Sequence, residues 1–428
     1  MQRAGGAARP RLSHAAVSEW DRRIVRFLLE AVGSPPLKVI LWDGKEVGGL
    51  SGETIARMWV RDRRTLLKLL VDPSFQFGEA YSSGAVVVDG DLVGLLASLE
   101  RSLRHGVSAT FLGRLVSRWL HRARRSEPAA ARENIHHHYD IGNDFYRLWL
   151  DDQLVYTCAY FASPEQSLED AQVAKFDHVC RKLELQPGQQ VVEAGCGWGG
   201  LALHMARHYG VAVRAYNLSH EQIVYARARA EREGLSGRVE FVEDDWRNIN
   251  GEYDVFVSVG MLEHVGRTNY RLLGDVIDGC LRPWGRGLIH SIGRNHPQPL
   301  DPWIRRRIFP GAYPPALGEM MEIFEANNFS VLDVENLRLH YAETLRQWME
   351  RYESAVPTIA RMFDERFVRM WRLYLAGSIA AFEAGGLQLF QIVFARGDDN
   401  QVPWTREFLY RPEPTVVGRS ADGNGSRT

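Results

Sequence analysis

Short apolar runs and amphipathic stretches alternate through the second half of the chain. Seven apolar runs have the length of buried strands, at residues 191–194, 211–216, 239–242, 253–259, 287–292, 330–334 and 387–395. Amphipathic stretches at residues 201–209 and 221–233 predict helices between the first three runs. Strands that alternate with helices form parallel sheets, so the pattern predicts an α/β fold with a mostly parallel, doubly wound, seven-stranded sheet. Such sheets bind ligands beyond the carboxyl ends of their strands, where the strand order reverses.

The first hundred residues have a different pattern. Apolar runs at residues 37–42 and 85–88 each end at an Asp-Gly turn signal, and they predict strands of a small α+β domain over residues 18–100. Residues 1–17 and 411–428 are rich in Arg, Pro, Gly, Ser and Asn and lack apolar periodicity. Both ends are therefore predicted to be mobile.

A strongly basic segment follows the small domain and is predicted to be a linker helix over residues 101–134. Residues 101–126 contain seven arginines and no acidic residue, with Phe111, Leu115 and Trp119 at roughly helical spacing. A basic amphipathic helix of this kind can lie on an anionic lipid surface. The alternative is a linker helix whose arginines are only solvated.

Composition and charge narrow the class of protein. The chain has 428 residues, of which 45% are hydrophobic and 25% charged, as in folded globular proteins. Lys+Arg minus Asp+Glu is 52 − 53 = −1, so no general field attracts nucleic acid. The four cysteines form no CxxC pair, which argues against a zinc site or a disulfide scaffold and favours the cytoplasm. Neither a secretion signal nor a membrane-spanning run of about 18 apolar residues is expected.

A glycine-rich turn follows the first of the seven apolar runs. Glu193 is followed by Gly195, Gly197 and Gly199, and glycines here let backbone N–H groups approach a ligand closely. The dinucleotide fingerprint also requires an acid at the end of the next strand, and this strand ends at Asn217 instead. S-adenosylmethionine fits this pattern better. Glu193 would then meet the methionine ammonium, and Asp245 and Trp246 would flank the adenine.

Several histidines and one glutamate are further candidates. His136, His137 and His138 are adjacent, but neighbouring residues on a helix point about 100° apart, so they do not predict a metal site. Glu263 and His290 each follow a predicted strand, where folds of this class place catalytic groups. For each of these two alone, a purely structural role is an equally good interpretation.

Several short motifs, taken together, are specific for one family of proteins. HHYDIGNDFYRLWL, YTCAYF, EAGCGWGGLA, LEHVG, LIHSIG, IFPGAYPP and LHYAETLRQW occur between residues 137 and 348. In this order and spacing they resemble the cyclopropane-fatty-acyl-phospholipid synthases and the related mycolic acid cyclopropane synthases. The resemblance covers roughly residues 75 to 400, and the small N-terminal region is similar to that of the longer phospholipid enzymes.

The resemblance implies an S-adenosylmethionine-dependent methyltransferase fold and specific site residues. The catalytic domain would span residues 135–410 and contain a channel for an acyl chain. Bicarbonate would be held by Cys158, Glu263, His290, Tyr341 and the backbone around Ile292. S-adenosylmethionine would contact Glu193, Tyr156, Thr157, Gly195, Gly197, Asn217, Gln222, Asp245 and Trp246, with His138 and Tyr139 nearby. Thr157, Glu193 and Asn217 differ from the residues common in relatives, but each keeps a polar group.

The activity implied is transfer of a methylene carbon to the cis double bond of an unsaturated phospholipid acyl chain. The carbocation formed would be stabilised by aromatic faces, with Tyr146, Tyr160, Tyr313 and Phe309 as candidates, and then deprotonated by bicarbonate. Alternatives are a methylene-branched product, a covalent mechanism through Cys158 and a non-catalytic lipid-binding protein. The partner would be the inner face of a bacterial cell membrane, bound peripherally by residues 101–126 or 304–309. Relatives often dimerise, so a homodimer is also possible.

Overall fold

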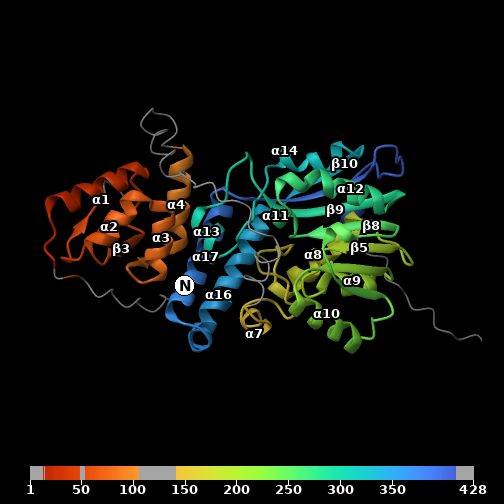
Figure 1. The fold of residues 1–428 in the computed structure, drawn as a ribbon, viewed down its shortest axis with the longest axis horizontal. Coiled ribbons are helices and arrows are strands. Elements are labelled where there is room, and N and C mark those ends of the chain that lie inside the picture. Colours follow the sequence, from red (N-terminus) through yellow and green to blue (C-terminus); the bar gives the residue numbers. More distant parts are fainter. Residues whose placement is uncertain (1–12, 14, 49–53, 106–140, 411–428) are drawn as a thin grey trace, which may run out of the picture.

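The computed structural model describes residues 13, 15–48, 54–105 and 141–410 (Figure 1). Its N-terminal part is a four-stranded sheet in the order β2-β1-β3-β4. The strands are β1 (Leu37–Ile40), β2 (Glu46–Val47), β3 (Ala56–Val60) and β4 (Val86–Gly90). The helices are α1 (Glu19–Ala31), α2 (Arg63–Val71), α3 (Pro73–Ser82) and α4 (Leu92–His105). An α+β arrangement was expected here, and α4 continues past residue 100, where the sequence predicts a domain boundary.

Side-chain caps explain where three of these helices begin. Ser18 accepts a hydrogen bond from the Asp21 backbone, and the Asp21 side chain reaches back to Ser18. Asp62 caps α2, and Asp72 caps α3 directly before Pro73.

The larger part of the molecule is built on a seven-stranded sheet in the order β10-β11-β9-β8-β5-β6-β7. The strands are β5 (Gln190–Ala194), β6 (Ala212–Asn217), β7 (Val239–Glu243), β8 (Tyr253–Val259), β9 (Leu281–Gly293), β10 (Phe329–Asn336) and β11 (Gln388–Arg396). These are the seven predicted strands, although β9 begins earlier than its apolar run. Only β11 is antiparallel to its neighbours, β9 and β10, within this sheet. The sheet is therefore mostly parallel and doubly wound, as predicted, and its strand order reverses between β5 and β8.

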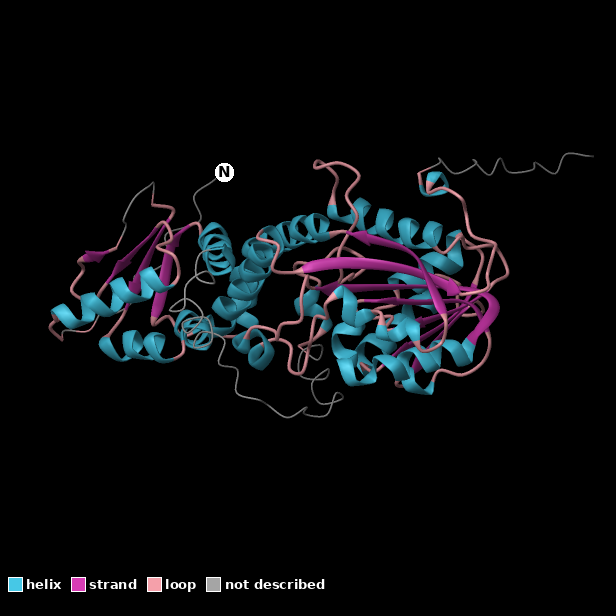
Figure 2. Cartoon of the chain, turned by 90° about the horizontal axis from the view of Figure 1, so that it is seen from above, coloured by secondary structure: helices cyan, strands magenta, loops and turns pink. Residues whose placement is uncertain are grey.

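Helices cover both faces of the large sheet (Figure 2). One apolar core lies between the strands and α8 (Leu168–Lys182), α9 (Gly200–His208) and α10 (His220–Arg232). The opposite core involves α12 (Tyr270–Cys280), α14 (Leu317–Met320) and α15 (Glu322–Glu325). Burial on both faces explains why central strands such as β8 and β11 are apolar along most of their length.

Three further helices lie between the small sheet and the large one (Figure 1). They are α13 (Pro302–Arg307), α16 (Arg338–Met362) and α17 (Glu365–Glu383), while α7 (Asn143–Tyr146) and α11 (Leu262–Val265) are single turns. Glu79 of α3 accepts two hydrogen bonds from Arg307, at 2.8 and 2.9 Å, and one from Arg366 at 3.0 Å. Gly78 packs so closely on Trp303 that a Cβ would lie 2.4 Å from the indole ring. The small domain is thus attached to α13 and α17.

Candidate active site

The glycine-rich loop after β5 is the first part of the site. Gly195, Gly197 and Gly199 have φ angles of 86°, 54° and 82°, a region that favours glycine. A Cβ on Gly195 would lie 2.9 Å from Met261, and one on Gly199 would lie 2.5 Å from Phe241. Nothing described lies within 4 Å of a Cβ placed on Gly197. The loop is therefore packed tightly against the protein but leaves room for a ligand at Gly197.

Polar residues from the next two strands lie at the same edge of the sheet. Asn217, which ends β6, donates a 2.7 Å hydrogen bond to Oε1 of Gln222. Asp245 follows β7 and caps a short 3-10 helix in which Trp246 is buried. Because β5, β6 and β7 are parallel, the structure brings these predicted cofactor residues to one edge, at the carboxyl ends of the strands.

Two buried titratable residues lie next to the glycine-rich loop. Glu193 is 2% exposed, and its Oε2 has no hydrogen-bond partner among the described residues. Burial raises the pKa of Glu193 to about 8, although nearby Lys175 opposes the rise. Lys175 donates a 3.1 Å hydrogen bond to Oγ1 of Thr157, and burial lowers its pKa to about 8. The unpartnered oxygen of Glu193 is suited to an ammonium group of a ligand.

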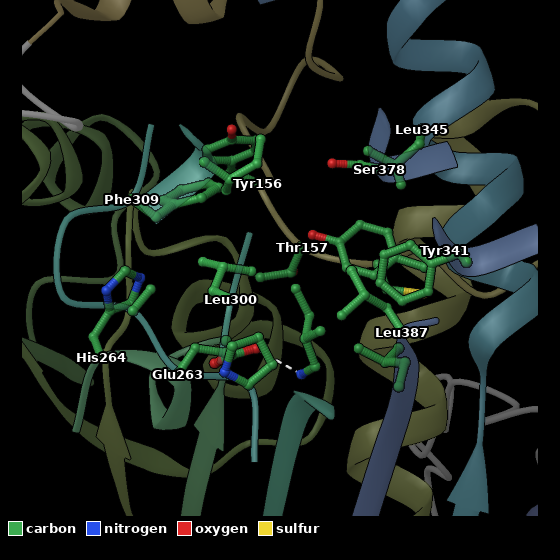
Figure 3. A pocket seen from close by; sticks show the side chains of 18 of the residues that line it. Tyr156, Thr157, Glu263, His264, Leu300, Phe309, Tyr341, Leu345, Ser378 and Leu387 are labelled. Carbon is green, nitrogen blue, oxygen red and sulfur yellow. Dashed lines mark hydrogen bonds between the residues drawn. The ribbon is translucent and has the colours of Figure 1, made fainter. Parts of the chain in front are cut away.

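A cavity of about 100 Å³ is the second part of the site (Figure 3). It lies beyond the carboxyl ends of β8 and β9. One side is lined by residues 156–158, the β8–α11 turn, the end of β9 and the segment around α13, and further residues come from α16, α17 and β11. Gly260 lines the cavity, while its neighbour Met261 packs against Gly195 of the glycine-rich loop. The cavity and the loop therefore meet at this turn.

Glu263 lies at the strand-end side of the cavity (Figure 3). It belongs to α11, which starts just after β8, and its Oε1 accepts a 2.6 Å hydrogen bond from the Ile292 N–H. Its Oε2 is buried and has no hydrogen-bond partner within the described part of the chain. Burial raises the pKa of Glu263 to about 7, so the carboxyl group titrates near neutral pH.

His290 lines the same cavity from β9 and is 1% exposed. Its Nδ1 lies 3.1 Å from Nε2 of Gln391 on β11. Burial lowers the pKa of His290 well below its usual range, and the cations of Lys175 and Lys182 lower it further. The ring is therefore neutral at pH 7.

Cys158 and Tyr341 complete the polar side of the cavity. The Cys158 thiol is fully buried and donates to the Ala159 carbonyl at 3.1 Å. Burial raises the pKa of this thiol far above its usual value, so a thiolate does not form at neutral pH. Tyr341 comes from α16 (Figure 3), and its ring centroid lies 4.7 Å from that of Phe382 on α17.

The remaining lining is mainly apolar and aromatic. Tyr374, Ser378 and Phe382 recur every four residues and so share one face of α17. The Tyr374 hydroxyl lies 2.8 Å from the Tyr156 hydroxyl. The other wall residues are Leu300, Ile304, Phe309, Ala312, Pro314, Leu345, Leu387 and Leu389.

Three of the four aromatic residues predicted to stabilise the carbocation do not line the cavity. Of Tyr146, Tyr160, Tyr313 and Phe309, only Phe309 lines the cavity. Tyr160 is stacked between two histidine rings, and the Tyr313 hydroxyl donates to a carboxylate. Tyr146 is fully buried within a cluster of other aromatic rings. Further aromatic rings that line the cavity are those of Tyr156, Tyr341, Tyr374 and Phe382.

The structure thus groups the predicted site residues into two adjoining sets. Around the cavity lie Tyr156, Thr157, Cys158, Glu263, His290, Ile292 and Tyr341. Around the glycine-rich loop lie Glu193, Gly195, Gly197, Asn217, Gln222, Asp245 and Trp246. His138 and Tyr139 lie outside the described residues.

Sequence reasoning missed Lys175, Gln391 and the α17 face. The sequence does contain a signal for Lys175 and for Gln391. Lys175 lies on the buried face of α8, and Gln391 interrupts an apolar strand that is buried along almost its whole length. Buried polar groups of this kind need partners, which identifies them as candidates for a site.

Comparisons with known proteins show the family to which the chain belongs. The family model described as mycolic acid cyclopropane synthetase matches residues 126–392, and a domain of unknown function matches residues 24–107. A probable fatty acid methyltransferase of Pseudomonas putida is 37% identical over 389 residues, covering 88% of this chain and 96% of the relative. The cyclopropane-fatty-acyl-phospholipid synthase of Escherichia coli K12 is 37% identical over 358 residues, covering 82% of this chain and 91% of the relative.

A solved structure matches the larger domain. The mycolic acid cyclopropane synthase CmaA1, complexed with SAH and CTAB, aligns with a TM-score of 0.59 and 29% identity. The alignment covers 63% of this chain and 99% of CmaA1. The family model spans more than half of the chain, and the relatives match over most of their own length. The chain therefore belongs to the mycolic acid cyclopropane synthetase family of S-adenosylmethionine-dependent methyltransferases.

Proposed function

We propose that the protein transfers a methylene carbon from S-adenosylmethionine to the cis double bond of an unsaturated phospholipid acyl chain, forming a cyclopropane ring. The observation that carries this proposal is the composition of the cavity. Apolar and aromatic side chains form most of its wall, while Cys158, Glu263, His290 and Tyr341 supply polar groups. An acyl chain needs the first kind of surface, and proton removal from a carbocation needs the second.

The residues around the glycine-rich loop fit S-adenosylmethionine. Gly197 leaves open space beside the backbone, and the unpartnered Oε2 of Glu193 can accept a hydrogen bond from the ammonium group. Asp245 and Trp246 would flank the adenine from the end of β7. The relative CmaA1 was solved with SAH, the product that remains after methyl transfer.

The cavity also has groups suited to bicarbonate. Glu263 has a buried oxygen without a described partner, and Ile292 places a backbone N–H beside the same carboxyl group. His290 and Tyr341 line the same space and can donate to oxygen atoms. When bound, S-adenosylmethionine would supply the methyl carbon, and bicarbonate would supply the base that takes a proton from it after transfer.

The chain's own side chains would hold the alkene, exclude water and stabilise positive charge. In the reaction the alkene π electrons form the new carbon–carbon bond while the methyl–sulfur bond breaks. The neighbouring carbon becomes a cation, and loss of a methyl proton leaves the electron pair that closes the ring. Phe309, Tyr156 and Tyr374 present aromatic faces for that cation. The neutral Cys158 thiol would line the pocket without acting as a nucleophile.

We further infer that the protein works at the cytoplasmic face of a cell membrane. Within the described residues, no helix is long and apolar enough to cross a bilayer. The basic segment of residues 101–126 is the main candidate for surface binding, although residues 106–126 lie outside the described part. In the second candidate segment, Ile304 and Phe309 line the cavity and Arg307 is paired with Glu79. This leaves the first segment as the stronger candidate.

The activity is tested by incubating the purified protein with labelled S-adenosylmethionine and vesicles of unsaturated phospholipid. Mass spectrometry should show that lipids gain about 14 mass units, one CH₂ group, and NMR should show upfield cyclopropyl protons. Vinylidene protons would instead identify a methylene-branched product, which arises when the same cation loses a different proton. Absence of any mass gain, with S-adenosylmethionine still bound, would overturn the proposal in favour of a non-catalytic lipid-binding protein.

Membrane binding is tested by sedimentation with anionic vesicles at low and high salt. Arginine-mediated binding should be lost at high salt, because salt screens exposed charges. Binding that does not depend on salt would contradict a basic docking segment.

A further inference from the structure

A line of hydrogen-bonded polar side chains, buried except for Glu335, leads to His290 from the side of α8. Oε2 of Glu335 on β10 lies 2.6 Å from Nε2 of His178 and 2.6 Å from Nζ of Lys182. Lys182 Nζ also donates a 2.8 Å hydrogen bond to Oε1 of Gln391, and Nε2 of Gln391 lies 3.1 Å from Nδ1 of His290. Lys182, Gln391 and His290 are each at most 2% exposed.

The strand arrangement produces this contact. Gln391 on β11 is directly opposite His290 on β9 in the antiparallel register. Side chains of directly opposite residues lie on the same face of a sheet, so the two groups are held side by side by the backbone. The one antiparallel strand of the large sheet is therefore the strand that supplies the partner of His290.

Hydrogen-bonding chemistry fixes the direction of each bond in the line. An ammonium group has only donors, so Lys182 requires the amide oxygen of Gln391. The amide NH₂ of Gln391 must then face His290, and because an NH₂ group can only donate, Nδ1 of His290 must accept. A neutral imidazole that accepts at Nδ1 carries its proton at Nε2. Nε2 is also the ring nitrogen that remains for a ligand in the cavity.

We propose that Gln391 is a positioning residue that holds His290 in the Nε2–H tautomer, with Lys182 and Glu335 orienting the Gln391 amide. This proposal rests on the proposed function, in which His290 donates a hydrogen bond to an anion in the cavity. The opposite tautomer would present a lone pair to that anion and repel it. Tautomer control thus makes His290 a donor without requiring it to be charged.

Substitution of Gln391 by Glu tests the proposal while keeping the size of the side chain. A carboxylate accepts hydrogen bonds, so Gln391→Glu should place a proton on Nδ1 of His290. Charged or titratable groups near His290 are Lys175, Lys182 and His178 of α8, Glu335 of β10, and Glu263, Cys158 and Tyr341 at the cavity. In this setting the new carboxylate adds negative charge and should favour the imidazolium at low pH.

The expected readouts are the tautomer and the pH profile. In protein labelled with ¹⁵N-histidine, with the His290 signal assigned from a His290→Gln sample, wild type should show an unprotonated Nδ1 and a protonated Nε2. Gln391→Glu should show a protonated Nδ1 at every pH. Its turnover should fall on the order of 10²-fold at high pH, where Nε2 loses its proton, and recover on acidification. Gln391→Met should populate both tautomers and lower turnover without this pH dependence.

The matched control is Gln388→Glu, which places the same substitution on the same strand. Gln388 bonds to Asn336 and Gly385, not to His290, so its variant should leave the His290 spectrum unchanged. A protonated Nδ1 in wild type, or an unprotonated Nδ1 in Gln391→Glu, would overturn the proposal. If wild type shows the Nε2–H tautomer but modifies no lipid, the proposed function fails while the tautomer assignment stands. If lipid is modified while Nδ1 is protonated, only the tautomer assignment fails.

Discussion

The Ile292 N–H donates a 2.6 Å hydrogen bond to Oε1 of Glu263, so the backbone end of β9 orients this carboxyl group in the cavity. Most of the residues that would hold S-adenosylmethionine come instead from the ends of β5, β6 and β7 or from the turns that follow these strands. Removing the charge of Glu263 should therefore affect turnover without affecting cofactor affinity.

We expect Glu263→Gln to lower turnover on the order of 10²-fold and to change the S-adenosylmethionine dissociation constant less than about twofold. Lipid mass spectrometry measures the first quantity and calorimetric titration the second. The control is Glu325→Gln, at an exposed position of α15. Equal losses of turnover and cofactor affinity in Glu263→Gln would contradict the assignment.

The same residue makes stability depend on pH. Burial raises the pKa of Glu263 to about 7 in the folded state, above the value of about 4.3 expected for an unfolded chain. The folded state therefore binds more protons between these values, and this contribution to stability decreases as pH rises through the window. Glu263→Gln should be more stable than wild type by about 1–3 kcal/mol at pH 8. Urea unfolding in bicarbonate-free buffer should show that the difference disappears near pH 4.

Substitution of Cys158 distinguishes a thiol that only lines the cavity from a thiol that acts as a covalent nucleophile. Because burial raises the pKa of its thiol, and the thiol donates to the Ala159 carbonyl, Cys158→Ser keeps a donor of similar size. We expect turnover of this variant to stay within about tenfold of wild type, since nucleophilic attack would need a thiolate. A folded Cys158→Ser protein that binds S-adenosylmethionine but has no measurable turnover would support the covalent mechanism.

Substitution of Gly78 tests whether packing of the N-terminal domain against α13 supports the cavity. A Cβ at Gly78 would lie 2.4 Å from the indole of Trp303, which is next to the cavity residue Ile304 on α13. Gly78→Ala should lower the free energy of unfolding by about 1–3 kcal/mol, as overpacking generally does, and should also reduce turnover. Gly279→Ala on α12 is the control, because nothing described lies within 4 Å of its Cβ. If thermal denaturation shows that Gly279→Ala is less stable than Gly78→Ala, the packing argument is refuted.

The sequence predicted those parts of the fold that depend on local pattern. Strands buried on both faces, such as residues 253–259, are mostly apolar, and the glycines at 195, 197 and 199 are required by the backbone of a single turn. The cavity residues Cys158, Glu263, His290 and Tyr341 could be proposed from motifs because each lies in a distinctive short segment.

The other cavity wall could not be predicted in this way, because it depends on which distant segments meet. Tyr374 and Ser378 are ordinary residues on an amphipathic helix, and only packing of α17 against the cavity gives them a place at the site. Gln391 has a partner only because β11 pairs with β9 in one particular register. The sequence showed a polar residue in an apolar strand but gave no indication of the partner.

The position of β11 has a consequence for protein synthesis. This strand is the last of the sheet to leave the ribosome, yet it lies between β9 and β10, which are made earlier. A nascent or truncated chain that lacks residues 388–396 would expose the unpaired edge of β9, which invites aggregation. Such a chain would also leave His290 without Gln391, so the site becomes complete only when translation of the domain is almost finished.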